Sequence, residues 1–307
     1  MDVVTGAFGY IGRYIARQLL ANGRSVKTIT THPDKPNPFG AAVQAFPYDF
    51  DIPERLVQNL RDADTLYNTY WVRFDHGSST FDKALENTGI LFEAAREAGV
   101  QKIVHIGVTQ ASESSDLPYY RGKAIQEKML AEIGIAYSIV RPTLVFGKED
   151  ILVNNIAWLL RRFPVFPIFG SGNYRVQPVF VADLAAIAVA RAAYPGNERI
   201  DAVGPETFTF EQLVMLMQSQ ISPKTKLVHL PPGMGVWLGQ VIGIALRDVV
   251  LTRDELKGLM DSLLTSAQTP NGTTRFSIWL AENAEFLGTS YSSELDRHYR
   301  WKPSREK

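Results

Sequence analysis

The sequence predicts an α/β fold in which a doubly wound parallel sheet is followed by a smaller C-terminal α/β lobe. Three observations support this prediction. Strand-like and helix-like segments alternate up to about residue 147, a glycine-rich turn joins the first strand to the first helix, and prolines interrupt the alternation after residue 147. Such alternation is typical of a parallel sheet covered by helices. The length of 307 residues and the hydrophobic content of 45% suit one large domain with a smaller lobe.

The first strand and the first helix enclose the most informative segment. Residues 5–12 read Thr-Gly-Ala-Phe-Gly-Tyr-Ile-Gly, between a short apolar strand and a helix whose apolar residues recur every four positions. Glycines let the backbone turn tightly and approach a pyrophosphate, and the dipole of the following helix attracts negative charge. A dinucleotide is the first ligand to consider, although any close-packed strand-to-helix turn looks similar. With a second strand after the helix, this is the setting of a Rossmann-type fold.

The remaining elements of the first domain, residues 1–147, continue the alternation. Strands are expected at 25–30, 43–47, 64–69, 102–107 and 136–141, and helices at 53–61, 80–98 and 118–132. The helix at 80–98 is expected to bury one stripe, formed by Phe81, Leu85, Thr88, Phe92 and Ala95. Doubly wound sheets bind ligands at the carboxyl ends of their strands, so the functional site is expected there.

Residues 148–307 are expected to form mainly the smaller substrate lobe, with segments at about 176–203 returning to the first domain. Thr209 with Gln212, and Thr252 with Glu255, have the spacing of capping boxes, so each pair predicts the start of a helix. The longest apolar run, 234–246, is shorter than the roughly 20 residues that cross a bilayer. It therefore predicts a packing helix and no transmembrane segment, with a membrane-surface or lid helix as the alternative.

The composition argues against several classes of function. Lys plus Arg and Asp plus Glu both number 32, so no basic excess draws the protein to nucleic acid. The absence of cysteine excludes disulfides, thiolate catalysis and iron–sulfur clusters, and it fits a reducing compartment. The five histidines have no paired spacing, so no metal site is predicted. No signal peptide is recognised, and a cytoplasmic location is expected.

Tyr119 and Lys123 are the candidate catalytic pair. They stand four residues apart at the start of a helix that Pro118 helps to begin, so both side chains lie on one face. A lysine ammonium near a phenol lowers the phenol pKa from about 10, which lets a tyrosine act as acid or base near neutral pH. The same spacing is frequent on exposed helices, so an ordinary surface pair is the alternative.

Together, these motifs resemble the extended and atypical short-chain dehydrogenases/reductases, the NAD-dependent epimerase/dehydratase-like proteins. The resemblance rests on the glycine turn, on Tyr119 and Lys123, on Asn87, and on Arg-Pro-Thr-Leu-Val-Phe-Gly at 141–147. It continues with Gly-x-Gly at 170–172, Gln-Pro-Val at 177–179 and Val-Ala-Asp-Leu at 181–184. The branch that contains the nucleotide-binding accessory subunit of respiratory complex I is the most similar.

The resemblance implies a role for each matching position. Asp49 and Phe50 would border the adenine, and Pro142 and Val145 would contact the nicotinamide. Tyr119 would move the proton, while Lys123 would bond the nicotinamide ribose and tune Tyr119. The full set of implied cofactor residues is Gly6, Phe8, Gly9, Tyr10, Ile11, Gly12, Thr31, His32, Asp49, Phe50, Asn68, Tyr70, Lys123, Pro142 and Val145. For Asn68 and Tyr70, an equally good interpretation is that their polar groups form hydrogen bonds with the backbone at the ends of the strands.

The chain departs from the family pattern at two positions. Where the family usually has Ser or Thr after the fifth strand to bond the substrate oxygen, Val108 stands here, and only Thr109 offers a hydroxyl. Thr109 is therefore the third candidate catalytic residue, and losing such a donor commonly costs about 100-fold in rate. After the second strand, Thr31 and His32 replace the acidic ribose partner of NAD-preferring sites, with Lys35 nearby. This gives NADP(H) a slight preference over NAD(H).

Three functions are compatible with these motifs. The first is an NAD(P)-dependent oxidoreductase or epimerase-like enzyme acting on a small carbonyl or alcohol substrate. The alternative is a non-catalytic NAD(P)(H)-binding sensor or assembly subunit, which Val108 favours, and a purely structural interaction protein is a third. The loop at 70–75, Tyr-Trp-Val-Arg-Phe-Asp, could recognise an aromatic or anionic substrate, or be a packed loop with a solvated arginine. A homo-oligomer and an assembly partner both remain open.

Overall fold

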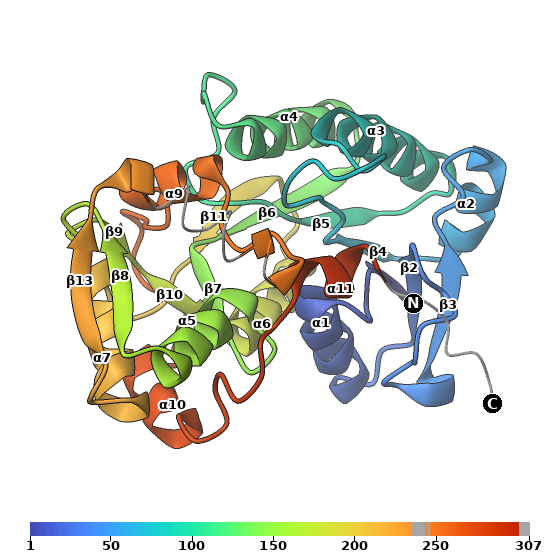
Figure 1. Ribbon diagram of the computed structural model, residues 1–307. Helices are drawn as coiled ribbons and strands as arrows, with labels where there is room; N and C mark the ends of the chain where they lie inside the picture. Colours follow the sequence, from blue (N-terminus) through green and yellow to red (C-terminus); the bar gives the residue numbers. More distant parts are fainter. Residues whose placement is uncertain (235–242, 245, 301–307) are drawn as a thin grey trace. The chain divides into compact units, whose positions relative to one another are not determined.

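The computed structural model describes residues 1–234, 243–244 and 246–300 (Figure 1). The chain divides into two compact units. The first contains Met1–Pro142 and Val181–Ala202, and the second contains Thr143–Phe180 and Val203–Lys307. The first unit thus ends five residues before the expected position 147, because strand β7 (Leu144–Phe146) pairs with β10 (Pro178–Phe180) of the second unit.

The first unit is built on a seven-stranded sheet with the order β11-β6-β5-β4-β1-β2-β3. Every neighbouring pair in it is parallel, which confirms the predicted doubly wound α/β class. The chain order reverses between β1 and β4, which makes their carboxyl ends the switch point where such sheets bind ligands. The strands are β1 (Asp2–Thr5), β2 (Val26–Thr30), β3 (Val43–Pro47), β4 (Thr65–Asn68), β5 (Lys102–Ile106), β6 (Ala136–Pro142) and β11 (Glu198–Ala202).

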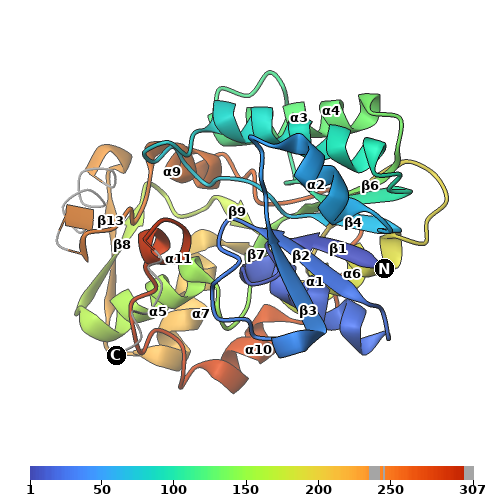
Figure 2. The same ribbon diagram turned by 90° about the vertical axis from the view of Figure 1, so that its right-hand side faces the viewer.

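Helices cover both faces of this sheet (Figures 1 and 2). Helices α2, α3 and α4 lie on one face, and α1 and α6 lie together on the other. Their bounds are α1 (Tyr10–Ala21), α2 (Pro53–Leu60), α3 (Phe81–Glu97), α4 (Pro118–Glu132) and α6 (Val181–Arg191), with a short 3-10 turn, η1 (Gly40–Ala42), before β3. All the strands and helices predicted up to residue 141 are confirmed, with their ends shifted by one residue or two at most.

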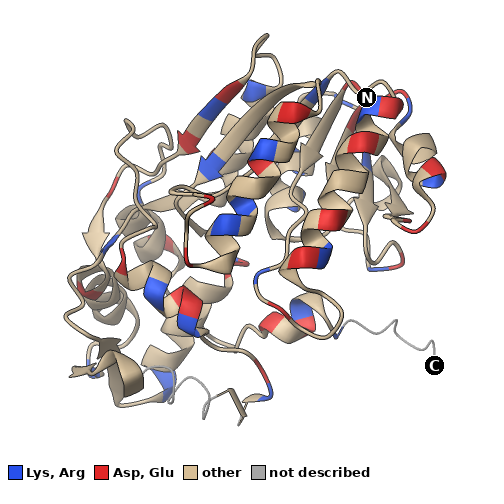
Figure 3. Cartoon of the chain, turned by 90° about the horizontal axis from the view of Figure 1, so that it is seen from above, with Lys and Arg blue, Asp and Glu red and all other residues tan. Residues whose placement is uncertain are grey.

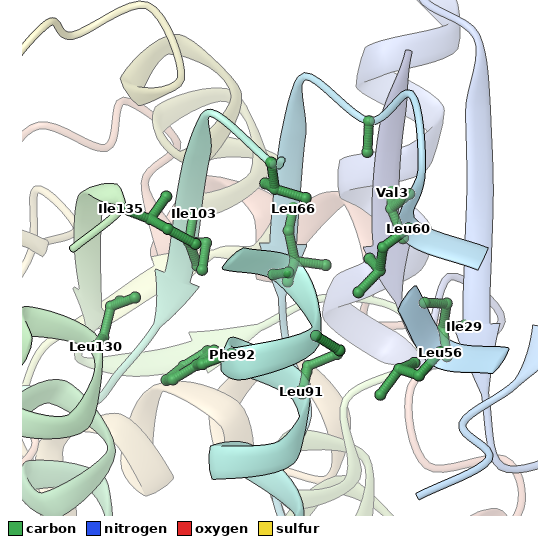
Figure 4. Close-up of a cluster of buried hydrophobic side chains, with 14 of the residues drawn as sticks. Val3, Ile29, Leu56, Leu60, Leu66, Leu91, Phe92, Ile103, Leu130 and Ile135 are labelled. Atoms are coloured by element: carbon green, nitrogen blue, oxygen red, sulfur yellow. The ribbon is translucent and has the colours of Figure 1, made fainter. Parts of the chain in front are cut away.

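The core of the first unit fills the layer between the sheet and helices α2, α3 and α4 (Figure 4). Leu66 and Ile103 point from the central strands toward the helix that carries Leu91 and Phe92. Strands β1, β4 and β5 are buried along their whole length, as expected for strands covered on both faces. This continuous burial holds their carboxyl ends in fixed register.

Helix α3 buries a face rotated from the predicted stripe. Thr80 caps its first turn by accepting a hydrogen bond from the amide of Lys83. Thr88, Phe92 and Ala95 are buried as predicted, but Phe81 and Leu85 are only partly buried. The buried residues are Ala84, Asn87, Thr88, Leu91, Phe92, Ala94 and Ala95. The buried face is rotated from the predicted one because α3 packs against α2 and α4 as well as against the sheet. Smaller residues therefore occupy some of the buried positions.

The second unit has its own core of aromatic and aliphatic side chains. Both predicted capping boxes are confirmed, Thr209 opening α7 and Thr252 opening α9. The predicted packing helix at 234–246 lies mostly outside the described residues. Besides β7 and β10, its elements are α5 (Ile151–Arg162), β8 (Val165–Phe169), β9 (Arg175–Val176), β12 (Phe208–Thr209), α7 (Phe210–Ile221), β13 (Lys226–Leu230), α9 (Arg253–Met260), α10 (Phe276–Asn283) and α11 (Glu294–His298).

Charged residues of both signs are interspersed along the helices that cover the sheet face (Figure 3). This mixing agrees with the equal numbers of basic and acidic residues in the sequence. Among the described residues, no helix has both the length and the apolar character needed to cross a membrane.

Candidate functional site

The glycine turn lies directly after β1, at the switch point of the sheet. Gly6 has a φ of +64°, a conformation that residues with a side chain rarely adopt. Its amide donates to the carbonyl of Ile29 on β2 (2.8 Å), and its own carbonyl accepts the amide of Gly9 (2.8 Å). Helix α1 begins at Tyr10, and Gly9 is its N-cap residue. Glycine has no side chain that could accept a hydrogen bond from the first amides of the helix. The turn therefore presents helix amides that a bound anion can use.

The close packing of α1 on this turn requires a glycine at position 12. A Cβ atom there would lie 2.8 Å from the carbonyl carbon of Gly6 and 3.0 Å from the carbonyl oxygen of Thr5. No larger residue fits without moving the turn, which is the role of the third glycine in dinucleotide-binding sites. Arg13, which sequence reasoning missed, donates from Nη2 to the carbonyl of Phe8 (3.1 Å), so its guanidinium lies beside the turn.

Side chains join the carboxyl ends of β1 and β4. The amide of Thr69 donates to Oγ1 of Thr5 (2.7 Å), and Oγ1 of Thr69 donates to the carbonyl of Thr5 (2.6 Å). Oδ1 of Asn68 accepts the amide of Tyr70 (3.0 Å). Asn68 thus organises the strand ends in this structure, and direct contact of Asn68 and Tyr70 with a cofactor stays a prediction.

Asn68 also connects to His105 on β5. Because Oδ1 of Asn68 accepts from Tyr70, its Nδ2 faces Nδ1 of His105 at 3.1 Å and donates to it. The proton of the neutral imidazole is then on Nε2, which has no hydrogen-bond partner among the described residues. Full burial, together with the charge of Lys123, holds the pKa of His105 well below its usual range, so the ring stays neutral.

The predicted ribose and adenine residues follow β2 and β3. Thr31 is exposed, and the pKa of His32 is lowered by partial burial and by the charge of Lys35. Asp49 has a φ of +44°, and the ring of Phe50 stacks on Tyr48 with centroids 4.8 Å apart. The sheet therefore brings these residues to the same edge as the glycine turn, since all carboxyl ends of a parallel sheet share one edge.

An aromatic cluster links the end of β3 to the loop after β4. The ring of Tyr70 lies 5.0 Å from that of Tyr48 and 5.3 Å from that of Phe50. Nδ2 of Asn87, on α3, donates to the hydroxyl of Tyr70 (2.9 Å). Burial of this hydroxyl raises the pKa of Tyr70, so it remains protonated and can donate in turn.

Lys123 is buried near the carboxyl end of β5. Its side chain is 3% exposed, and Nζ donates to the carbonyl of Ile106 (2.8 Å). Burial lowers its pKa to about 7, and the carboxylate of Glu127 opposes this shift. Tyr119, one turn earlier on α4, is partly buried. The helix therefore places both members of the predicted pair at the binding edge of the sheet.

Glu127 is a further charged residue near this pair that the sequence did not indicate. It is almost fully buried and accepts from Nε of Arg141 (2.8 Å), with Nε of Arg199 at 3.6 Å. A Cβ at position 107 would lie 2.8 Å from Oε1 of Glu127, which explains Gly107 at the end of β5. The only sequence signal for Glu127 is its spacing of four residues from Lys123.

Thr109, the third predicted catalytic residue, is fully buried. Its Oγ1 lies 3.5 Å from Oδ2 of Asp201 on β11, and its amide donates to the carbonyl of Pro142 (3.1 Å). Val108 is also buried. The Thr109 hydroxyl thus has a neighbour on β11, and its role toward a substrate stays a prediction. Pro142 ends β6 in the first unit, whereas Val145 lies on β7 in the second.

Proteins of known sequence resemble this chain over much of its length. Subunit 9 of the NADH dehydrogenase (ubiquinone) 1 alpha subcomplex, mitochondrial, of Arabidopsis thaliana is 26% identical over 239 residues, which are 74% of this chain and 60% of that protein. Photosystem II assembly factor Ycf39 of Cyanidium caldarium is 23% identical over 244 residues, 78% of each chain. The chain covers less than two thirds of the Arabidopsis protein and of its Dictyostelium discoideum counterpart, 60% and 65%.

Solved structures share the fold. The NADPH-dependent quinone oxidoreductase QOR2 of Escherichia coli, complexed with NADPH, superimposes with a TM-score of 0.72 at 21% identity, covering 93% of this chain and 99% of that one. The model of the NAD dependent epimerase/dehydratase family matches residues 3–201. Because this match covers well over half of the 307 residues, the chain belongs to the NAD dependent epimerase/dehydratase family.

Proposed function

We propose that this chain is an NAD(P)(H)-dependent oxidoreductase or epimerase-like enzyme acting on a small carbonyl or alcohol substrate. The supporting observation is that α4 carries Tyr119 and Lys123 to the same sheet edge as the glycine turn. A protein that only binds a nucleotide could use Lys123 to bond the ribose, but it has no chemical use for a tyrosine that moves a proton. Family membership supports the cofactor class.

The residues of the first unit fit a dinucleotide. The packed turn of Gly6 and Gly12 and the uncapped amides of α1 suit a pyrophosphate, and the guanidinium of Arg13 lies beside them. A bound nicotinamide would supply or accept hydride. Lys123 would bond the ribose, and Tyr119 would give a proton to the substrate oxygen or take one from it.

The same site supports a preference for NADP(H). No acidic residue occupies positions 30–32 after β2, and Lys35 adds positive charge next to His32. Exposed Asp34 lies in the same loop, which limits the preference. Parallel titrations with NADPH and NADH by calorimetry measure it directly, and tighter binding of NADH would contradict it.

Substitution of Gly9 tests dinucleotide binding at the turn. Gly9 stands at the N-cap of α1 with an extended backbone, a position where aspartate is favoured in ordinary helices. Gly9→Asp adds a carboxylate there, and Gly9→Ala, the matched control, adds a Cβ without the charge. In either variant the Cβ would lie 3.1 Å from the carbonyl oxygen of Gly6, a tight contact that both share. We expect Gly9→Asp to fold as Gly9→Ala does but to lose NADPH binding, because its carboxylate would repel the phosphates. Equal NADPH affinity of Gly9→Asp and Gly9→Ala in calorimetry would contradict this site.

The second candidate function is a nucleotide-binding assembly or sensor protein without turnover. Val108 in place of a hydroxyl residue, and Asp201 beside the Thr109 hydroxyl, favour it. So do the relatives whose names refer to a respiratory subunit and an assembly factor. A screen of small aldehydes and ketones that follows NADPH absorbance separates the two, since NADPH binding without any oxidation would favour the second function.

A further inference from the structure

Trp71 lies against the catalytic pair from a different element. It follows β4 by three residues, yet its indole reaches α4, where the Lys123 ammonium lies 5.2 Å from the ring centroid. The ring of Tyr119 meets it edge to face at 6.3 Å. Trp71 therefore contacts both members of the pair, although the sequence suggested for its loop only substrate recognition or plain packing.

The close approach depends on Gly122, which lies between Tyr119 and Lys123 on α4. A Cβ at this position would lie 2.6 Å from Cη2 and 2.7 Å from Cζ2 of Trp71. Any other residue would push the indole away, because a rigid ring cannot yield as a flexible side chain can. The close approach of the Trp71 ring thus explains why position 122, within Tyr-x-x-x-Lys, is a glycine.

The buried position of the indole leaves its N–H group without a hydrogen bond. Its Nε1 is buried and has no partner among the described residues. Buried donors are normally satisfied, so an unsatisfied one needs a compensating interaction. The ammonium contact is suited to this, since cation–π contacts are strongest where the cation is shielded from water. On its other side, Lys123 donates to the carbonyl of Ile106, so its ammonium lies between the ring and the end of β5.

We propose that Trp71 is a positioning residue, which holds the Lys123 ammonium against the end of β5 and fixes its orientation relative to Tyr119. This proposal rests on the proposed function of the pair. The loop after β4 would then also keep water from Lys123. Low water access also agrees with the lowered pKa of Lys123.

The rate of acetylation of Lys123 by acetic anhydride, followed by peptide mass spectrometry in the full protein without cofactor, tests this proposal. Acetic anhydride reacts with the free amine of Lys123, which the indole covers. We expect Trp71→Ala to raise the rate about tenfold or more, because removing the ring uncovers Nζ, and a shielded contact of this kind is worth about that factor. Trp71→Phe keeps an aromatic ring and should stay closer to the wild type. Lys102 is the internal control, because it is also a largely buried lysine, lies at the opposite end of β5 and donates to the carbonyls of Tyr194 and Gly196.

Gly122→Ala provides the sharper variant. Alanine favours a helix over glycine, so this change should not unfold α4 while it displaces the indole. We expect faster acetylation of Lys123 and no change at Lys102. Gly89→Ala on α3 is the matched control, because its Cβ would meet only the flexible end of Met129. It should leave both lysines unchanged.

Unchanged Lys123 rates in both Trp71→Ala and Gly122→Ala would overturn the proposal. If Trp71→Ala unfolds, which fast acetylation of Lys102 would reveal, Trp71→Phe and Gly122→Ala decide the outcome. NADPH binding is measured separately by calorimetry. Failure of the wild type to bind NADPH would contradict the proposed function, while the acetylation rates still decide whether Trp71 positions Lys123.

Discussion

At the residue scale, the site depends on buried polar groups whose partners come from distant parts of the chain. Lys123 donates to Ile106 on β5, and Asn68 on β4 bonds His105 on β5. Such contacts leave no spacing pattern in the sequence. The sequence nevertheless indicated Lys123, which belongs to the Tyr-x-x-x-Lys motif, and Asn68, which the family resemblance implied. Neither the motifs nor the resemblance indicated Glu127 or Trp71 as site residues.

Tyr119 is the residue on which the proposed reaction depends. We expect Tyr119→Phe to lower turnover by about 100-fold or more, the usual contribution of a positioned acid or base, and to leave NADPH affinity unchanged. Tyr120→Phe removes the adjacent hydroxyl on the same helix and is the control. Steady-state rates from NADPH absorbance, with a substrate found in the carbonyl screen, provide the measurement. Equal turnover in Tyr119→Phe and the wild type would mean that Tyr119 is not the acid.

At the element scale, local signals predicted where helices begin better than which face they bury. Thr209 and Thr252 sit in capping boxes that need only neighbouring residues, so the sequence identified both. The buried face of α3 depends on α2 and α4 as well as on the sheet, so Phe81 and Leu85 were expected at positions that the structure leaves partly exposed. Helical periodicity defines a stripe but not its exact rotation.

The cap of α7 should stabilise the second unit. Oγ1 of Thr209 accepts the amide of Gln212 (3.1 Å), and α7 buries Leu213, Val214 and Met217 in the core of that unit. We expect Thr209→Ala to lower the free energy of unfolding by about 1 kcal/mol, the typical value of a lost cap. Thr209→Ser keeps the hydroxyl and should stay near the wild type. Urea titration followed by circular dichroism measures both, and equal midpoints for Ala and Ser would contradict the cap.

At the scale of the whole molecule, the parallel sheet brings the residues of the candidate site together. Gly6 directly follows β1, and Asn68 and Ile106 end β4 and β5. These three strands are neighbours in the parallel sheet, so the three residues lie at one edge of it. The alternation of strands and helices was sufficient to predict this edge. The first unit ends at Pro142, the last residue of β6, whereas the sequence pattern alone placed this boundary five residues later, at residue 147.

Buried bases make the stability of the molecule depend on pH. The pKa of Lys123 is lowered to about 7 and that of His105 lies well below 6.5. Between pH 7 and about 10 the unfolded chain binds a proton at Lys123 that the folded protein lacks, so stability rises with pH by up to about 1.4 kcal/mol per unit. Below about pH 6.5 the same reasoning for His105 predicts falling stability as the unfolded imidazole takes up a proton.

Chemical denaturation at a series of pH values checks this dependence. We expect Lys123→Met to flatten the rise between pH 7 and about 10, because methionine fills the site without a titrating group. Lys128→Met removes an exposed lysine of the same helix and should keep the wild-type slope. A slope in Lys123→Met as steep as in the wild type would show that Lys123 is not the buried base responsible.

The sequence by itself determined the fold class, the order of strands and helices in the first unit, and the glycine turn, because these follow from local periodicity and from the conformational freedom of glycine. It also located Tyr119 and Lys123 on one helical face. Only the tertiary structure decided how they are held. The indole of Trp71, in the loop after β4, and the carbonyl of Ile106, at the end of β5, reach Lys123 from two elements outside its own helix, and such contacts exist only once the chain is packed.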